Sequence, residues 1–223
     1  MTSYVLFSLY IAAAIVNVVA RLLVLDAVAM YSKVLLMPLL IAYVYEAAKK
    51  NVTLLVLLLC AALIFSWGGD VALLYEGDTY FLLGMGSFLI AQLIYAYLFK
   101  KSIQLKIHWK WWYIAPVLLL TIGFLSQVLP KAGAFQIPIA VYALAISVMA
   151  IAAIARHGKV GEKSFKLVVA GAIIFVISDC TIAWNKFVMP FELADAFVML
   201  TYTTAQLLIV RGILIQKWRI EIG

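Results

Sequence analysis

The main ionisable residues inside long apolar runs of the sequence are Lys33, Asp70 and Asp179. If these runs cross a membrane, each such residue costs at least ~2.5 kcal/mol on insertion scales and therefore needs a specific role. One role is a structural ion pair, in which Lys33 binds one aspartate and joins two helices. That pair leaves the second carboxyl group unexplained. Two carboxyl groups in one apolar site favour acid–base catalysis or proton transfer.

The apolar runs that carry these residues are long enough to cross a bilayer. Of the 223 residues, 67% are hydrophobic and 12% are charged, and the mean hydropathy is +1.12. A soluble domain is nearer half apolar and could not bury this much apolar surface in one core. Runs of about 20 apolar residues between short charged connectors are typical of a polytopic helical membrane protein. The predicted fold class is therefore all-α, with about eight transmembrane helices.

The connectors between the predicted spans are short, so neighbouring helices should pack antiparallel in a single transmembrane domain, residues 1–223. This organisation leaves no room for a separate soluble domain. The predicted spans cover residues 4–20, 28–45, 52–72, 79–99, 112–128, 135–155, 165–184 and 194–215.

The basic residues are distributed unevenly between the two sides of the predicted bundle. Of the 17 Lys and Arg residues, twelve fall on the side of the two termini, three on the other side and two within spans. The positive-inside rule then predicts that both termini are cytoplasmic. The same distribution explains the net charge of +7 without nucleic acid as a partner. Short loops and the lack of a retention signal favour a bacterial inner membrane.

The two halves of the chain resemble each other around the aspartates. Asp70 in the third span and Asp179 in the seventh are each followed one span later by the string Ala-Gln-Leu, at 91–93 and 205–207. Four spans separate the copies, a spacing that predicts a parallel 4+4 repeat around an axis along the membrane normal. On this hypothesis the two aspartates are symmetry mates that face each other across a central cavity.

Depth counts place the intramembrane polar residues at similar levels of the bilayer. At ~1.5 Å per residue, Asp70 lies ~27 Å and Asp179 ~21 Å from the cytoplasmic ends of their helices. Lys33 and Tyr202 also reach the outer third of a ~30 Å hydrocarbon core. We therefore expect one polar cavity, open toward the outer leaflet, that holds Lys33, Asp70, Gln92, Asp179, Tyr202 and Gln206.

Several short sequence blocks that contain or flank these residues are distributed along the chain from the second span to the eighth. They are Phe65-Ser66 with Gly69-Asp70, Phe81-x-x-Gly84 followed by Phe88, Tyr95, Ser178-Asp179, Asn185-Lys186-Phe187, and Tyr202 with Ala205-Gln206. Together these blocks resemble the YhhN-like lysoplasmalogenase family of multi-pass membrane proteins. The family often has His where this chain has Gln92, and Lys-Pro where it has Lys33-Val34.

The resemblance implies an enzyme that hydrolyses the vinyl-ether bond of lysoplasmalogens, which are 1-alkenyl lysophospholipids, to a fatty aldehyde and a glycerophospho-base. Protonation of the vinyl β-carbon creates an oxocarbenium ion, and water then adds to give a hemiacetal that collapses. This chemistry needs a positioned acid and a nearby anion, as in glycosidases, and no metal or organic cofactor.

Under this resemblance Asp70 and Asp179 are the catalytic pair, one protonated and one ionised, with the two roles unassigned. Lys33 is expected to bind the substrate phosphate or to tune the pair. The residues expected to hold water or the glycerol hydroxyl are Gln92, Asn185, Tyr202 and Gln206.

Two other classes of protein use the same features. A proton-coupled transporter or lipid translocase would carry protons on the intramembrane acids and alternate its access around a 4+4 repeat. It would show flux that depends on a proton gradient and would form no product. A binding or scaffold protein would use the aspartates only structurally, so Asp70→Asn and Asp179→Asn would lower its stability without removing an activity.

Overall fold

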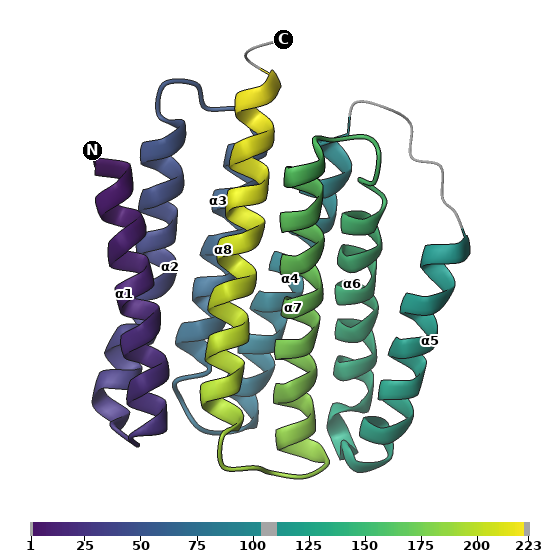
Figure 1. Cartoon of the computed structure of the whole chain (residues 1–223). Helices are drawn as coiled ribbons and strands as arrows, with labels where there is room; N and C mark the ends of the chain where they lie inside the picture. The colour runs from purple at the N-terminus through teal and green to yellow at the C-terminus, as the bar shows by residue number, and fades with distance from the viewer. Residues whose placement is uncertain (1, 104–110, 221–223) are drawn as a thin grey trace.

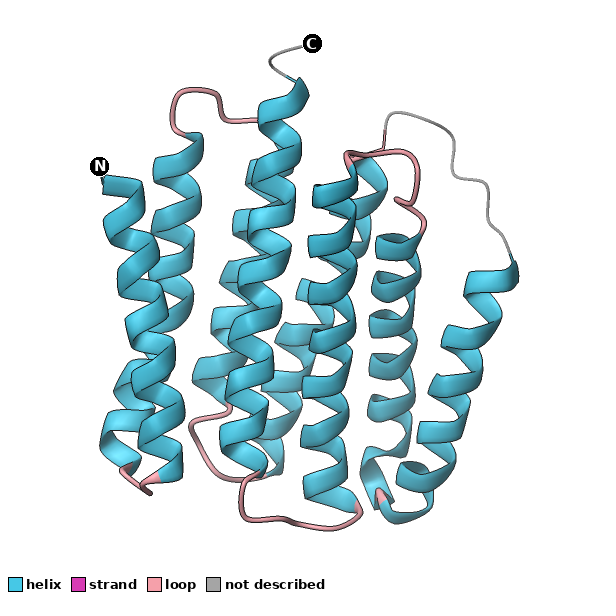
Figure 2. Ribbon diagram, viewed as in Figure 1, coloured by secondary structure: helices cyan, strands magenta, loops and turns pink. Residues whose placement is uncertain are grey.

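The structure is a computed structural model that describes residues 2–103 and 111–220, with the side chains of 217–220 left aside (Figures 1 and 2). Its regular elements are all helical, and eight helices are long and apolar enough to cross a membrane, which confirms the predicted fold class. The helices are α1 (Thr2–Leu22), α2 (Asp26–Ala48), α3 (Leu54–Ala72), α4 (Asp78–Lys101), α5 (Trp111–Val128), α6 (Gln136–Ile154), α7 (Glu162–Phe187) and α8 (Ala194–Ile220). Two short 3-10 helices, η1 (Leu129–Lys131) and η2 (Gly133–Phe135), join α5 to α6.

Consecutive helices run antiparallel, so α1 begins and α8 ends at the same end of the bundle (Figure 1). We call this the terminal end, and the opposite end, which carries the α1–α2, α3–α4, α5–α6 and α7–α8 connectors, the far end. Lys106 and Lys110, which the charge count above includes, lie outside the described residues. The described basic residues in or beside the connectors of the terminal end are Lys49, Lys50, Lys100, Lys101, Arg156, Lys159, Lys163 and Lys166.

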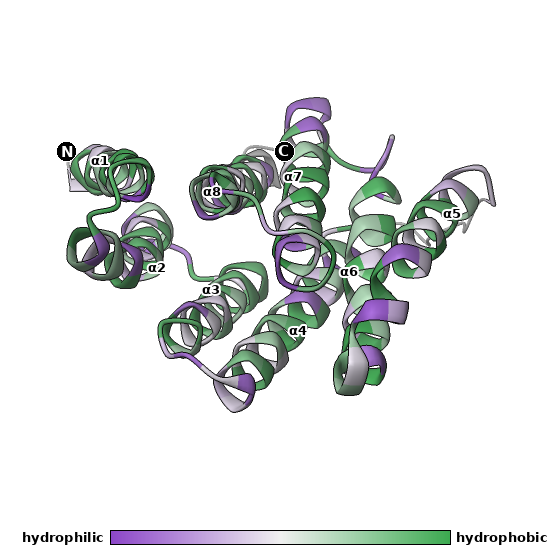
Figure 3. Ribbon diagram, turned by 90° about the horizontal axis from the view of Figure 1, so that it is seen from below, coloured by the Kyte–Doolittle hydropathy of each residue, from purple (hydrophilic) through white to green (hydrophobic). Residues whose placement is uncertain are grey.

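The helices pack as hairpins of unequal tightness. The α7–α8, α3–α4 and α1–α2 pairs make the most extensive contacts, whereas α5 touches mainly α6. Seen along the bundle, α5 stands at one edge (Figure 3), and its Leu119, Leu120 and Ile122 are exposed. This loose packing of α5 leaves space between it and the rest of the bundle.

Glycines allow the tight hairpins to form. In α3, a Cβ at Gly69 would lie 2.5 Å from the ring of Phe88 in α4. In α7, a Cβ at Gly171 would lie 2.8 Å from the side chain of Ile209 in α8. Small residues let transmembrane helices approach each other closely, so these positions set the separation of the helices that carry the aspartates.

Pro38 interrupts the backbone hydrogen bonding of α2 one turn after Lys33. Because proline has no N–H, the carbonyl group of Val34 loses its helical donor. The indole N–H of Trp67 in α3 supplies a replacement, donating to the Val34 oxygen at 3.0 Å. This bond joins α2 to α3 close to Lys33 and Asp70.

Arg156 follows α6 at the terminal end and is completely buried. It donates to the hydroxyls of Ser102 (3.0 Å) and Ser164 (2.8 Å) and to the amide oxygen of Gln216 (2.6 Å). Burial lowers the pKa of the Arg156 guanidinium to about 9, which leaves it charged at neutral pH. The residue therefore joins the ends of α4, α6, α7 and α8 by hydrogen bonds.

Candidate functional site

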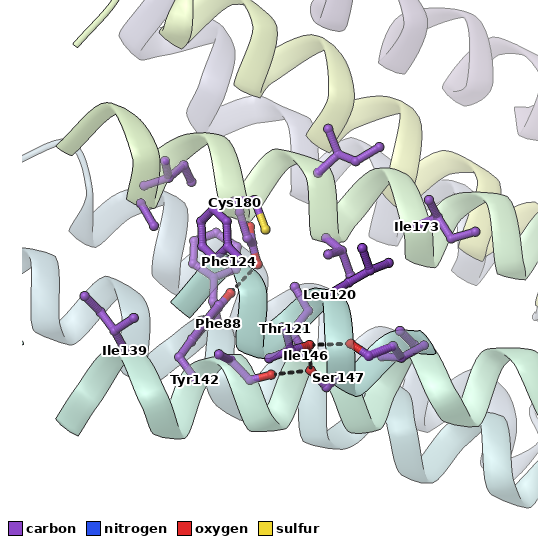
Figure 4. Close-up of a pocket in the computed structure, with 18 of the residues that line it drawn as sticks. Phe88, Leu120, Thr121, Phe124, Ile139, Tyr142, Ile146, Ser147, Ile173 and Cys180 are labelled. Atoms are coloured by element: carbon purple, nitrogen blue, oxygen red, sulfur yellow. Dashed lines mark hydrogen bonds between the residues drawn. The ribbon is translucent and has the colours of Figure 1, made fainter. Parts of the chain in front are cut away.

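A cavity of about 590 Å³ lies between α4, α5, α6 and α7 (Figure 4). Its wall is almost entirely apolar. Leu120, Ile173 and Ile177 line it while being 76%, 48% and 43% exposed, so the cavity reaches the apolar outer surface of the bundle. A bilayer covering that surface would give an alkyl chain direct lateral access to the cavity.

Asp179 in α7 is the one carboxyl group that lines this cavity among the residues the structure describes. Its Oδ2 accepts a hydrogen bond from the Tyr142 hydroxyl at 2.5 Å and another from Gln92 Nε2 at 3.4 Å. Among the described groups, none donates to Oδ1 or forms an ion pair with this carboxyl. One oxygen of Asp179 is thus held by neutral donors while the other remains available.

Asp70 occupies a different environment, enclosed between α2, α3 and α8. It is 2% exposed, and its Oδ1 lies 3.7 Å from the ammonium group of Lys33, which is 8% exposed. Its Oδ2 accepts a hydrogen bond from the Tyr202 hydroxyl at 2.7 Å. Lys33, Asp70 and Tyr202 are absent from the lining of the cavity. The ion pair considered above for Lys33 therefore forms, and Asp70 is its partner.

Gln206 lies in the core next to this cluster. Its Oε1 accepts from the Tyr95 hydroxyl at 2.5 Å, and its Nε2 donates to the Ser66 hydroxyl at 3.0 Å. All three residues are completely buried. Gln206 therefore links α3, α4 and α8 and does not line the cavity.

Gln92 and Asn185 also differ in their placement. Gln92 is completely buried and contacts Asp179, and its Oε1 has no described partner. Asn185 instead accepts a hydrogen bond at Oδ1 from the backbone N–H of Phe191, at 3.0 Å, and so stabilises the α7–α8 connector. Of the residues predicted to contact the substrate, Gln92 alone contacts the carboxyl group at the cavity.

Phe88 stands between the two carboxyl environments. Its ring lines the cavity, packs against Gly69 and meets the ring of Tyr202 edge-on, with centroids 5.8 Å apart. The single polar cavity expected from the sequence is thus replaced by two sites.

Tyr142 in α6 is a residue of this carboxyl site that the sequence analysis missed. It lies in a mostly apolar helix with no recognisable motif around it, yet its hydroxyl makes the shorter of the two hydrogen bonds to Asp179 (Figure 4). A buried tyrosine hydroxyl needs a polar partner, and this requirement was the available signal. Thr121 and Ser147, whose hydroxyls lie 2.7 Å apart, add a second polar spot to the lining.

Comparison with known proteins places these residues in a family. Residues 28–213, which include every residue of both carboxyl sites, match the model of the YhhN family. The chain belongs to the YhhN family. Within it, the chain is 33% identical over 158 residues to the human protein named lysoplasmalogenase TMEM86B, a match that covers 68% of this chain and 61% of that protein.

A second relative, the bovine protein named lysoplasmalogenase TMEM86A, is 32% identical over 151 residues, covering 66% of this chain and 61% of the relative. The YhhN-family chain thus spans about three fifths of the length of these curated relatives. No solved structure shows significant similarity to it.

Proposed function

We propose that this chain is a membrane-embedded hydrolase that cleaves the vinyl-ether bond of lysoplasmalogens to a fatty aldehyde and a glycerophospho-base. The observation that carries the proposal is the carboxyl group of Asp179, held by Tyr142 and Gln92 on the wall of an apolar, lipid-accessible cavity. Both relatives are named lysoplasmalogenase, which supports the same substrate class.

The length of the cavity suits the alkenyl chain of such a substrate. Tyr142 and Ile154 both line it, and their separation of twelve positions in α6 corresponds to about 18 Å. An extended chain of 16 carbons spans about 19 Å, at 3.8 Å for every three bonds. With the tail directed toward the terminal end, the vinyl ether lies at the level of Asp179.

In the proposed reaction Asp179 is the general acid. Its carboxyl proton moves to the β-carbon of the vinyl ether, the double-bond electrons form the new C–H bond, and the adjacent carbon becomes an oxocarbenium ion. Water then adds to that carbon, and the Asp179 carboxylate takes up the released proton. The resulting hemiacetal collapses to aldehyde and alcohol, so one water is consumed and the acid is regenerated.

Asp70 is the second member of the proposed pair and acts from behind Phe88. Lys33 and Tyr202 hold its carboxylate in one position. From there its charge favours the oxocarbenium ion without contact with the substrate, because charges interact strongly in a medium of low dielectric constant.

In the proposed orientation the protein lies in a bacterial inner membrane, with both termini on the cytoplasmic side. The support is the gathering of basic residues such as Lys49, Lys100 and Lys159 at the terminal end. In a background without Cys60 and Cys180, a membrane-impermeant maleimide should label Lys131→Cys in intact cells and Ser3→Cys only after permeabilisation. Labelling in the reverse order would contradict this orientation.

The test of the enzyme is aldehyde release from a 1-alkenyl lysophospholipid by the purified protein in detergent. Asp179→Asn removes the acid and should lower the rate by about 10²- to 10⁴-fold, the usual contribution of a general acid. Asp195→Asn is the matched control, because Asp195 is exposed and pairs with Arg21 at the far end. Wild-type protein that releases no aldehyde, or Asp179→Asn protein as active as the control, would refute the proposal.

A further inference from the structure

Lys186 lies at the C-terminal end of α7, where the cavity reaches the far end of the bundle. Its ammonium group is 4.4 Å from the ring centroid of Phe81, 5.5 Å from that of Phe135 and 5.7 Å from that of Phe187. Phe81 and Phe187 also line the cavity. Because the side chain of Lys186 is still 35% exposed, an accessible cation packs against two residues of the cavity wall.

The other described charge against Lys186 is the carboxylate of Asp78, the first residue of α4. The separation of 3.9 Å between Nζ and Oδ1 is long, and the Asp78 side chain is 75% exposed. Exposed ion pairs of this kind contribute little to stability. The pair therefore gives a positive and a negative group side by side, each able to bind a ligand.

The distance from Lys186 to Asp179 matches the dimensions of a lysoplasmalogen. The two residues are seven positions apart in α7, which places them on the same helix face about 10.5 Å apart along the axis. Seven bonds separate the vinyl β-carbon of the substrate from its phosphorus atom, an extended length of about 9 Å. A substrate with its β-carbon at Asp179 would thus carry its phosphate to Lys186.

Building on the proposed function, we infer that Lys186 and Asp78 form the headgroup site of this enzyme. Lys186 binds the substrate phosphate, and Asp78 binds the ammonium group of the headgroup. The site therefore selects zwitterionic lysophospholipids. It takes the role that the sequence suggested for Lys33, whose ammonium group is buried against Asp70 and does not line the cavity.

The test is binding of a 1-alkyl lysophosphoethanolamine, whose saturated ether is not protonated at carbon, to the full chain in detergent. Lys186→Gln should raise its Kd about tenfold, the effect of losing one charge-assisted hydrogen bond, while Lys186→Arg should restore binding. Lys131→Gln, which removes an exposed cation from the same end, is the matched control. The phosphate-free 1-alkylglycerol should bind wild type and Lys186→Gln equally.

If Lys186 is purely structural, its replacement will weaken the binding of both lipids to the same extent. That result would overturn the inference, and so would unchanged binding of both lipids. Asp78→Asn should weaken the ethanolamine lipid about tenfold and leave 1-alkyl-glycerol-3-phosphate unaffected. If Asp78→Asn instead raises the Kd for 1-alkyl-glycerol-3-phosphate as much as Lys186→Gln does, the two residues form only an ion pair between α4 and α7, and the inference is wrong.

Aldehyde release separates this inference from the proposed function. Protein that binds the alkyl lipid through Lys186 but releases no aldehyde from the alkenyl lipid would refute the hydrolase and retain the headgroup site. Active protein whose KM for the alkenyl lipid is unchanged by Lys186→Gln would refute the headgroup site and retain the hydrolase.

Discussion

Asp179 and Asp70 lie at comparable places in two tight helical hairpins, yet their surroundings differ. Asp70 has a cationic partner, a tyrosine donor and almost no exposure. Among the residues that the structure describes, the donors to Asp179 are the neutral side chains of Tyr142 and Gln92, and Asp179 borders a cavity. Both oxygens of the Asp70 carboxylate have partners, so this group can influence a ligand only through its charge, whereas the free oxygen of Asp179 at the cavity can exchange a proton with a ligand.

Removal of the Asp70 charge should give the largest difference in stability between the two sites. Asp70→Asn leaves the Lys33 ammonium buried without its counter-ion, a defect that costs about 3–5 kcal/mol. The double variant Lys33→Met/Asp70→Asn removes both charges and should recover most of that loss. Asp179→Asn should change the free energy of unfolding by about 1 kcal/mol, since no cation is left unpaired.

Reversible unfolding in detergent measures all three variants under the same conditions. Equal destabilisation by Asp70→Asn and Asp179→Asn would show that the two carboxyl groups play the same structural part.

The two tyrosines that donate to the carboxyl groups sharpen the comparison further. Tyr142→Phe removes the donor from Asp179 and should lower the rate of aldehyde release by about 10- to 100-fold, because one hydrogen bond to a charged group contributes about 1.5–3 kcal/mol. Tyr202→Phe removes the corresponding donor from Asp70 and should lower stability by about the same free energy. Its effect on rate should be smaller, because Tyr202 does not line the cavity.

Aldehyde release and unfolding measured on the same two preparations decide this point. A rate loss that is larger for Tyr202→Phe than for Tyr142→Phe would identify Asp70 as the proton donor.

The ring of Phe88, which separates the two sites, can be displaced by a substitution at Gly69 in α3. In Gly69→Ala the new methyl group would lie 2.5 Å from the Phe88 ring, so the ring must move at a cost of about 1–3 kcal/mol. Gly86→Ala is the matched control, because a Cβ there meets nothing within 4 Å. In that helix position alanine should stabilise by up to about 1 kcal/mol. Thermal unfolding of both variants tests the packing of Phe88 against Gly69, and equal stability of the two variants would show that this packing does not hold Phe88 in place.

The sequence by itself determined the eight helices and their hydropathy. Hydropathy is summed over residues that are neighbours in the chain. The lengths of the apolar runs and the positions of Lys and Arg therefore suffice to predict spans such as 52–72 and the gathering of basic residues at one end. It also singled out Lys33, Asp70 and Asp179, because an ionisable residue in an apolar run is visible without any knowledge of its neighbours. The parallel 4+4 repeat stays a prediction.

The tertiary structure alone decided which side chains meet. The direction of a side chain depends on the rotation of its helix about its own axis, and packing contacts such as Gly69 against Phe88 set that rotation. For this reason the sequence could not tell that Asp70 is enclosed with Lys33, that Asn185 binds a connector, or that Tyr142 reaches Asp179 from another helix. Composition and length are local properties, whereas a site assembled from several helices depends on contacts between residues far apart in the chain.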